Sequence, residues 1–198
     1  MYVETAYDFI EFLNIKSLGI NTIKHYGYFH LVPEDADGTI SIALDNALSC
    51  GMKMILCTEG AIPDVNLPSY INAHKSHPAT YAFASYDEPV SRNISYNDQA
   101  TRINTIRSNT NKPIVFVDNI YFANVYKHRL PPGYDIALVN AYSVRQDGVS
   151  DINQRIYNDA NKMRYSVGAM IAQSGIKRFI PIIDAFTSTI PQAITVMM

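Results

Sequence analysis

The sequence predicts an α/β protein, a TIM-type (β/α)8 barrel that is incomplete, with six to seven recognisable βα units. Apolar runs typical of strands alternate with helical patterns along most of the chain, which is the arrangement of a parallel sheet. Three of the strand ends, at Glu59, Glu88 and Asp118, follow one another at intervals of about 30 residues, close to the roughly 31 residues of one barrel unit. The sequence lacks the glycine-rich first turn typical of doubly wound nucleotide-binding sheets. These observations favour the barrel.

Six apolar runs are the expected strands, and each is followed by polar residues. They are Ile20–Phe29, Met52–Thr58, Thr80–Tyr86, Pro113–Val117, Tyr134–Val139 and Arg178–Ile183. Met1–Thr5 fits the tail of a first strand, and Ile194–Met198 is the segment that could serve as an eighth. Since this count falls short of eight clear units, the sequence predicts one of two things. Either the chain is a piece of a larger polypeptide, or it is a reduced barrel whose open edge is covered by a second copy or another chain.

Helical patterns precede most of these strands. They cover Phe9–Leu18, Ile40–Leu48, Ser69–Lys75, Asn97–Ser108 and Asp151–Ser174. Gly19, Gly51 and Gly175 stand where a helix should stop, because glycine readily adopts the left-handed conformation that ends a helix. The length favours one barrel domain over residues 1–198.

Composition excludes several classes of partner and cofactor. The formal net charge is −2, and Lys and Arg form no run, so a nucleic acid is not expected. No apolar stretch approaches the roughly 18 residues that would span a membrane. Cys50 and Cys57 are expected to be free thiols, with Cys57 inside the sheet. His25 and His30 lack the spacing of metal ligands on one strand, so neither a metal nor another cofactor is expected.

The polar residues after the strands define a candidate site. They are His30, Glu59, Asp87, Glu88, Asp118, Asn119, Asn140 and Asp184. The carboxyl ends of barrel strands meet on one face, where barrel enzymes place their acids and bases. Asp87-Glu88-Pro89 is the most informative of these segments, because Pro89 cannot continue the ladder and fixes the point where strand becomes loop. In a purely structural interpretation, Asp87 caps this loop and Glu88 faces solvent.

Several segments carry a resemblance to a known group of enzymes. They are Ser17 to Ile23, Cys50 to Leu56, His77 to Ala82 and Tyr86-Asp87-Glu88-Pro89. This pattern resembles the catalytic barrels of glycoside hydrolases of the large (β/α)8 clan. The resemblance implies a general acid/base Glu at the end of the fourth strand, which maps onto Glu88, and a nucleophile on the seventh, which maps onto Asp184. The clan usually has Asn before the acid/base and Glu on the seventh strand, where this chain has Asp87 and Asp184.

Glycoside hydrolysis needs two carboxyl groups facing one glycosidic bond, one as proton donor and one as nucleophile or base. Glu88 is the expected donor, because the like charge of Asp87 and a hydrophobic strand end favour its protonated form. Asp184 is the expected partner, Glu59 is an alternative to it, and either could instead serve only as a cap or turn residue.

The expected carbohydrate contacts lie near the other strand ends. The sequence has no Trp, so the candidates for stacking on a sugar ring are tyrosines near strand ends: Tyr28, Tyr86, Tyr121 and Tyr142, of which Tyr28 and Tyr142 are assigned to the site. The predicted hydrogen-bonding residues are His30, Glu59, Asp87, Asp118, Asn119 and Asn140. Two functions remain open: a glycoside hydrolase, or a non-catalytic barrel module that binds carbohydrate or forms part of a larger assembly.

Overall fold

A computed structural model gives the structure of the chain. The residues that it describes are 2–3, 8–25, 39–59, 64–119, 130–141, 157–158, 161, 175–176, 178–185 and 194–197. The side chains of 2–3, 25, 119, 140–141, 181–185 and 194–197 are not among the described parts.

The described strands form a closed barrel in the order β1 to β8. They are β1 (Tyr2–Val3), β2 (Thr22–His25), β3 (Lys53–Cys57), β4 (Thr80–Asp87), β5 (Ile114–Asn119), β6 (Ile136–Ala141), β7 (Arg178–Ala185) and β8 (Ile194–Met197). Each strand from β1 to β6 pairs in parallel with the next, which confirms the TIM-type α/β class and the parallel order predicted for Met52–Val139. The numbering also makes Thr80–Asp87 the fourth strand and Arg178–Ala185 the seventh, as predicted.

The last strand departs from the (β/α)8 repeat. β8 runs antiparallel to both neighbours, pairing Val196 with Ile183 of β7 and Thr195 with Tyr2 of β1. A parallel connection needs a crossover of about a dozen residues or more, and only residues 186–193 separate β7 from β8. The βα repeat is therefore incomplete, as predicted, but the described sheet closes through β8 and does not leave the predicted open edge. Packing of a second copy or another chain against the barrel stays a prediction.

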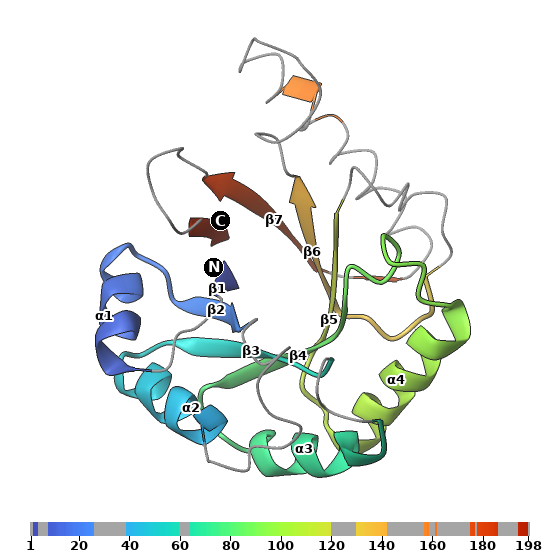
Figure 1. Cartoon of the computed structure of the whole chain (residues 1–198), viewed down its shortest axis with the longest axis horizontal. Helices are drawn as coiled ribbons and strands as arrows, with labels where there is room; N and C mark the ends of the chain where they lie inside the picture. The colour runs from blue at the N-terminus through green and yellow to red at the C-terminus, as the bar shows by residue number, and fades with distance from the viewer. Residues whose placement is uncertain are drawn as a thin grey trace.

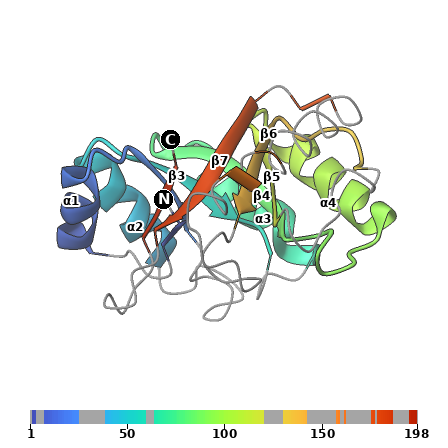
Figure 2. The same cartoon turned by 90° about the horizontal axis from the view of Figure 1, so that it is seen from above.

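The described helices lie on the outside of the barrel, around strands β1 to β5 (Figure 1). They are α1 (Phe9–Ser17), α2 (Thr39–Ser49), α3 (Leu67–His74) with the short 3-10 turn η2 (Asp64–Asn66) before it, and α4 (Tyr96–Asn109). In the view of Figure 2, α1 and α2 lie at the left of the barrel and α4 at the right. These helices confirm the predicted pattern within two residues at each end. Most of the longest predicted helix, 151–174, lies outside the described residues.

Local sequence explains where the helices begin and end. Asp8 and Glu11 form a capping box at the start of α1, each side chain accepting a backbone N–H from the other residue. Ser95 caps α4 by accepting the N–H of Asp98 at 3.1 Å. Gly51 follows α2 with φ of 64°, a conformation that only glycine adopts without strain.

The core consists of two layers, one on each face of the sheet. The outer layer joins strand residues such as Met54, Phe83 and Phe116 to helix residues such as Phe12 and Leu44, all fully buried. The inner layer contains strand residues alone, at alternating positions: Ile55, Cys57, Ala82, Ala84, Val115, Val117, Ile136 and Leu138. Because strand side chains alternate between faces, the inner set marks the face that points into the barrel.

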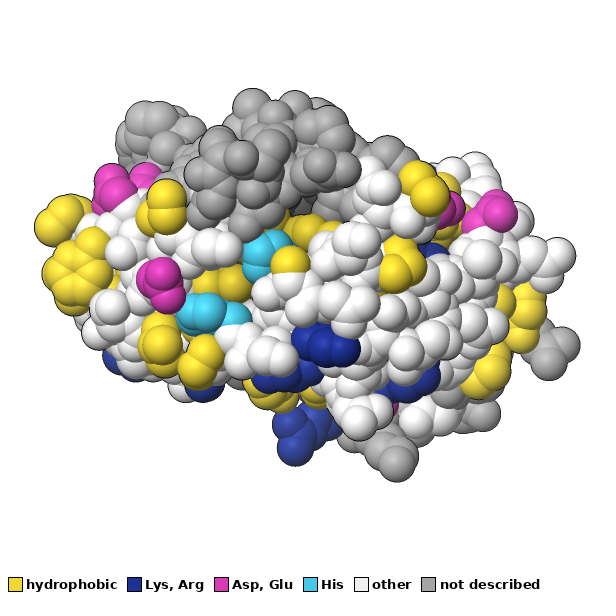
Figure 3. Space-filling view, turned by 90° about the horizontal axis from the view of Figure 1, so that it is seen from below, with side chains coloured by type: hydrophobic (Ala, Val, Ile, Leu, Met, Phe, Trp, Pro, Cys, Tyr) yellow, Lys and Arg dark blue, Asp and Glu magenta, His cyan; other side chains and the backbone are white. Residues whose placement is uncertain are grey.

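Charged side chains cluster at the amino-terminal end of β3. Lys53, the first residue of β3, donates from Nζ to the carbonyl of Pro78 at 2.7 Å, next to the hydrogen-bonded pair of His77 and Asp45. Lys and Arg side chains gather close to His on the face shown in Figure 3. This end of the barrel lies opposite the carboxyl ends, where the candidate site is expected.

Candidate functional site

A bulge in β4 decides which side chains reach the barrel interior. The pairing of β4 with β5 shifts between Ala84 and Asp87. Ser85 and Tyr86 both face the helices: the Ser85 hydroxyl lies 3.0 Å from a tyrosine hydroxyl of the outer layer, and the Tyr86 ring lies 4.4 Å from the Arg102 guanidinium of α4. Asp87 consequently points inward, although strict alternation would put Tyr86 there. Bulges commonly re-aim side chains in this way.

Inside the barrel, Asp87 meets a buried lysine. Lys24 of β2 is fully buried, and its Nζ donates to Asp87 Oδ1 at 2.9 Å. The two residues belong to strands that are not neighbours, since β3 lies between them. The ion pair therefore crosses the interior of the barrel from β2 to β4.

The peptide groups of Asp87 are held by a second charged pair. Its N–H donates to Glu59 Oε2 at 2.6 Å, and its carbonyl accepts from Arg92 Nη1 at 3.0 Å. The same Arg92 nitrogen donates to Glu59 Oε1. Glu59 is buried and Arg92 is partly exposed. Together with Lys24, this pair fixes Asp87 through its side chain and both of its backbone polar groups.

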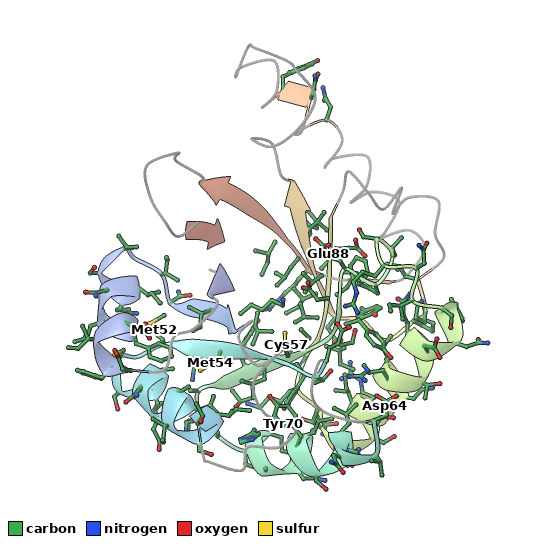
Figure 4. The ribbon with its side chains drawn as sticks, in the orientation of Figure 1. Met52, Met54, Cys57, Asp64, Tyr70 and Glu88 are labelled. Atoms are coloured by element: carbon green, nitrogen blue, oxygen red, sulfur yellow. The ribbon has the colours of Figure 1, made fainter. Side chains whose placement is uncertain are left out.

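Glu88 directly follows β4, is half-buried, and has a φ of 44° (Figure 4). Its N–H donates to the carbonyl of Val117 at 2.9 Å, and its carbonyl accepts from the N–H of Arg92 at 2.9 Å. The left-handed conformation costs a residue with a Cβ about 1–2 kcal/mol. Such strain persists only where the surroundings over-determine it, and here the hydrogen bonds on both sides of Glu88 do so.

Asp118, after β5, fastens the turn that follows Glu88. It is fully buried, and its two carboxylate oxygens accept from the Val90 N–H at 2.7 Å and the Ser91 hydroxyl at 2.6 Å. In this structure the group serves the turn. Its predicted contact with a sugar remains a prediction.

The structure brings together some of the predicted site residues. The Glu59 carboxylate accepts the backbone N–H of Asp87, Glu88 follows Asp87 directly in the chain, and Asp118 holds the next turn. Others are placed by their backbone alone: Asn119 pairs with Asn140 on the neighbouring strand, and Asp184 of β7 pairs with Thr195 of β8. Tyr28, His30 and Tyr142 lie outside the described residues.

Two residues of this site, Lys24 and Arg92, were not predicted from the sequence. Lys24 did carry a signal, because a lysine within the apolar run Ile20–Phe29 must either reach solvent or find a counter-charge. Arg92 carried none, because a basic residue in a polar loop is ordinarily a solvated surface group.

Cys57 lies on the inner face of β3, and burial, partly offset by the nearby Lys24 charge, raises the pKa of its thiol from 9.0 to about 11. The pKa of this thiol is higher in the folded protein than in the unfolded chain. The buried neutral thiol therefore makes its full contribution to the free energy of unfolding below pH 9, and this contribution is lost as the pH rises towards 11. A shift of about two units corresponds to about 2.7 kcal/mol.

We expect the free energy of unfolding of Cys57→Ala to fall less steeply than that of the parent between pH 8.5 and 11. The expected difference between the two slopes amounts to about 2–3 kcal/mol over this range, measured by urea unfolding. Parallel pH profiles for the two proteins would show that the buried thiol does not contribute.

The described residues include no group of three or more His, Cys, Asp or Glu that could hold a metal ion. Among the helices that the structure describes, none is long and apolar enough to cross a membrane.

Comparison with known proteins identifies the fold alone. No protein-family profile matches the chain, and no curated protein matches its sequence. Among solved structures, it is similar to a glycoside hydrolase family 5 protein from Bacteroides vulgatus ATCC 8482, with a TM-score of 0.55 and 12% identity over 90% of this chain and 46% of that one. An α-L-fucosidase candidate from Bacteroides thetaiotaomicron VPI-5482 gives a TM-score of 0.49 and 8% identity over 91% and 83%. The chain thus shares its barrel with the first protein and spans about half of that protein's length.

Proposed function

We propose that this chain is a glycoside hydrolase that cleaves a glycosidic bond of a carbohydrate by a two-carboxylate mechanism, with Glu88 as the proton donor. The observation that carries the proposal is the left-handed backbone of Glu88 at the end of the fourth strand. Strained residues that the surrounding structure holds in place cluster at active sites. The similarity of the barrel to that of a glycoside hydrolase supports the same reaction class.

In this mechanism Glu88 protonates the leaving oxygen, and Asp184 attacks the sugar or activates water. Asp184 is assigned by its place on the seventh strand. A separation of about 5 Å between the two carboxyl groups would give retention, and about 6.5–9.5 Å would give inversion. Glu59 accepts the N–H of Asp87 and pairs with Arg92, so its proposed part is to hold the loop. Asn119, Asn140, His30, Tyr28 and Tyr142 are the proposed sugar contacts.

One observation favours the alternative of a non-catalytic barrel that binds carbohydrate. Three carboxylates at the strand ends, those of Glu59, Asp87 and Asp118, accept hydrogen bonds from within the chain. These groups stabilise the loops after the strands whether or not a reaction takes place. A barrel that had lost its reaction would keep them for that reason.

A substrate panel tests the two functions directly. The purified protein is incubated with aryl glycosides, unactivated disaccharides and polysaccharides, and new reducing ends are measured; the hydrolase is expected to release sugar from at least one of them. Saturable binding by calorimetry without any release would instead establish the binding module. Neither release nor binding across the panel would contradict both functions.

The backbone strain at Glu88 predicts how two substitutions at this position differ in their free energy of unfolding. Glycine adopts the left-handed conformation freely, whereas alanine keeps the Cβ that opposes it. We expect Glu88→Gly to be more stable than Glu88→Ala by about 1 kcal/mol, measured by urea unfolding. Because both variants lack the carboxyl group, their difference isolates the backbone. A glycine variant less stable than the alanine variant would show that Glu88 is not strained.

A further inference from the structure

We infer that Lys24 is a positioning residue of this site: through the carboxylate of Asp87, its ammonium group holds the β4 bulge in the form that places Glu88. This inference rests on the proposed function for its catalytic consequence. Its structural consequence can be measured in the protein whether or not it is an enzyme.

The first step of the argument concerns burial. Lys24 is fully buried, and the Asp87 side chain is 9% exposed. Lysine is almost never fully buried without a partner, and removing both charges from water cancels much of what their attraction supplies. A pair of apolar side chains would fill the same space at least as favourably. The ion pair therefore contributes little to stability, and its specific contribution is to fix where Asp87 points.

The second step concerns the bulge. Without the register shift between Ala84 and Asp87, alternation would turn Asp87 towards the helices and Tyr86 into the barrel. The attraction of Lys24 is available to Asp87 only on the inner face, so it favours the bulged form over the regular one. Lys24 thus selects between two arrangements of the same strand.

The third step links the bulge to Glu88. Asp87 and Glu88 share a peptide bond, and the groups around it are held by Glu59, Arg92 and the carbonyl of Val117. If Asp87 turned outward, its N–H and carbonyl would move away from Glu59 and Arg92. Glu88 would then lose the bonds that keep its φ at 44°.

A double-mutant cycle tests the catalytic consequence with Lys24→Met, Asp87→Asn and the double variant. Each single change is expected to lower kcat by about 10- to 100-fold, the size of effect that a displacement of about 1 Å produces. KM should change by about threefold or less, because sugar contacts elsewhere are unaffected. Since Lys24 acts through Asp87, the double variant should be about as slow as either single variant. Effects on kcat that multiply would overturn the inference.

Amide hydrogen exchange tests the structural consequence without any substrate. In Lys24→Met, the exchange of the Asp87, Glu88 and Arg92 amides is expected to accelerate at least about tenfold more than that of the core amide of Phe116. Lys53→Met is the matched control, because it removes a lysine at the opposite end of the barrel and should leave all four amides unchanged. If Lys24→Met does not fold, Lys24→Gln removes the same charge and retains a polar group.

Failure of the positioning role of Lys24 and failure of the proposed hydrolase function give different results. Unchanged exchange at Asp87, Glu88 and Arg92 in a folded Lys24 variant overturns the inference, whatever the activity of the parent. An equal acceleration at Phe116 also overturns it, because Lys24 would then support the whole barrel. Faster local exchange in a protein that hydrolyses nothing on the panel would leave the positioning role in place and remove the proposed function.

Discussion

Replacement of Glu88 by Gln is expected to slow the hydrolysis of an unactivated glycoside by about 10²- to 10⁴-fold, the usual contribution of a general acid. Gln keeps the size of the side chain and most of its hydrogen bonding, but it has no proton to deliver to the leaving oxygen. The free energy of unfolding should change by about 1 kcal/mol or less. Steady-state kinetics on the parent and the variant give the ratio.

The leaving group supplies an internal control for this result. A glycoside with a good leaving group needs little protonation, so Glu88→Gln should slow it much less than an unactivated substrate. Glu11→Gln is the matched variant, because it makes the same chemical change in the capping box of α1, where Gln also functions. Equal activity of Glu88→Gln and the parent on an unactivated substrate would favour the binding module.

Removal of the Asp118 carboxylate is expected to lower the free energy of unfolding by several times the effect of a typical surface substitution. Asp118→Ala leaves the Val90 N–H and the Ser91 hydroxyl without their acceptor, and the Val90 position is 6% exposed. Since hydrogen bonds to a charged group contribute about 1.5–3 kcal/mol each, we expect a loss of about 3 kcal/mol. Urea unfolding should show a lower midpoint with an unchanged slope.

Asp45→Ala is the matched control for Asp118→Ala. Asp45 pairs with His77 at 3.0 Å, and its side chain is 74% exposed. An exposed pair of this kind contributes about 1 kcal/mol or less. Comparable losses in the two aspartate variants would show that burial does not set the strength of the Asp118 contacts.

The sequence was sufficient to predict most of the barrel, because strand and helix periodicities are local properties of the chain. Its two misses have physical reasons. The short apolar run Ile194–Met197 carries no sign of direction, so its antiparallel closure depends on the short connection from β7 and on two partner strands. The bulge at Asp87 depends on Lys24, which lies two strands away.

The candidate site shows the same division between local and distant causes. An acidic residue where a strand opens into a loop can be recognised from the sequence, and Glu88 and Asp118 were recognised in this way. Their different situations could not be predicted. Whether a carboxylate holds a turn depends on which backbone N–H groups the folded chain presents to it, as Val90 does to Asp118.

The antiparallel strand β8 also has a consequence for how the barrel forms. Each parallel ladder joins strands that follow one another in the sequence, whereas the pairing of Tyr2 with Thr195 joins opposite ends of the described chain. The entropy lost on closing a loop grows with its length, and contacts distant in sequence slow folding. The seam between β1 and β8 is therefore expected to form late. Contacts that form after the transition state mainly govern unfolding, so the lifetime of the folded barrel depends on this short seam.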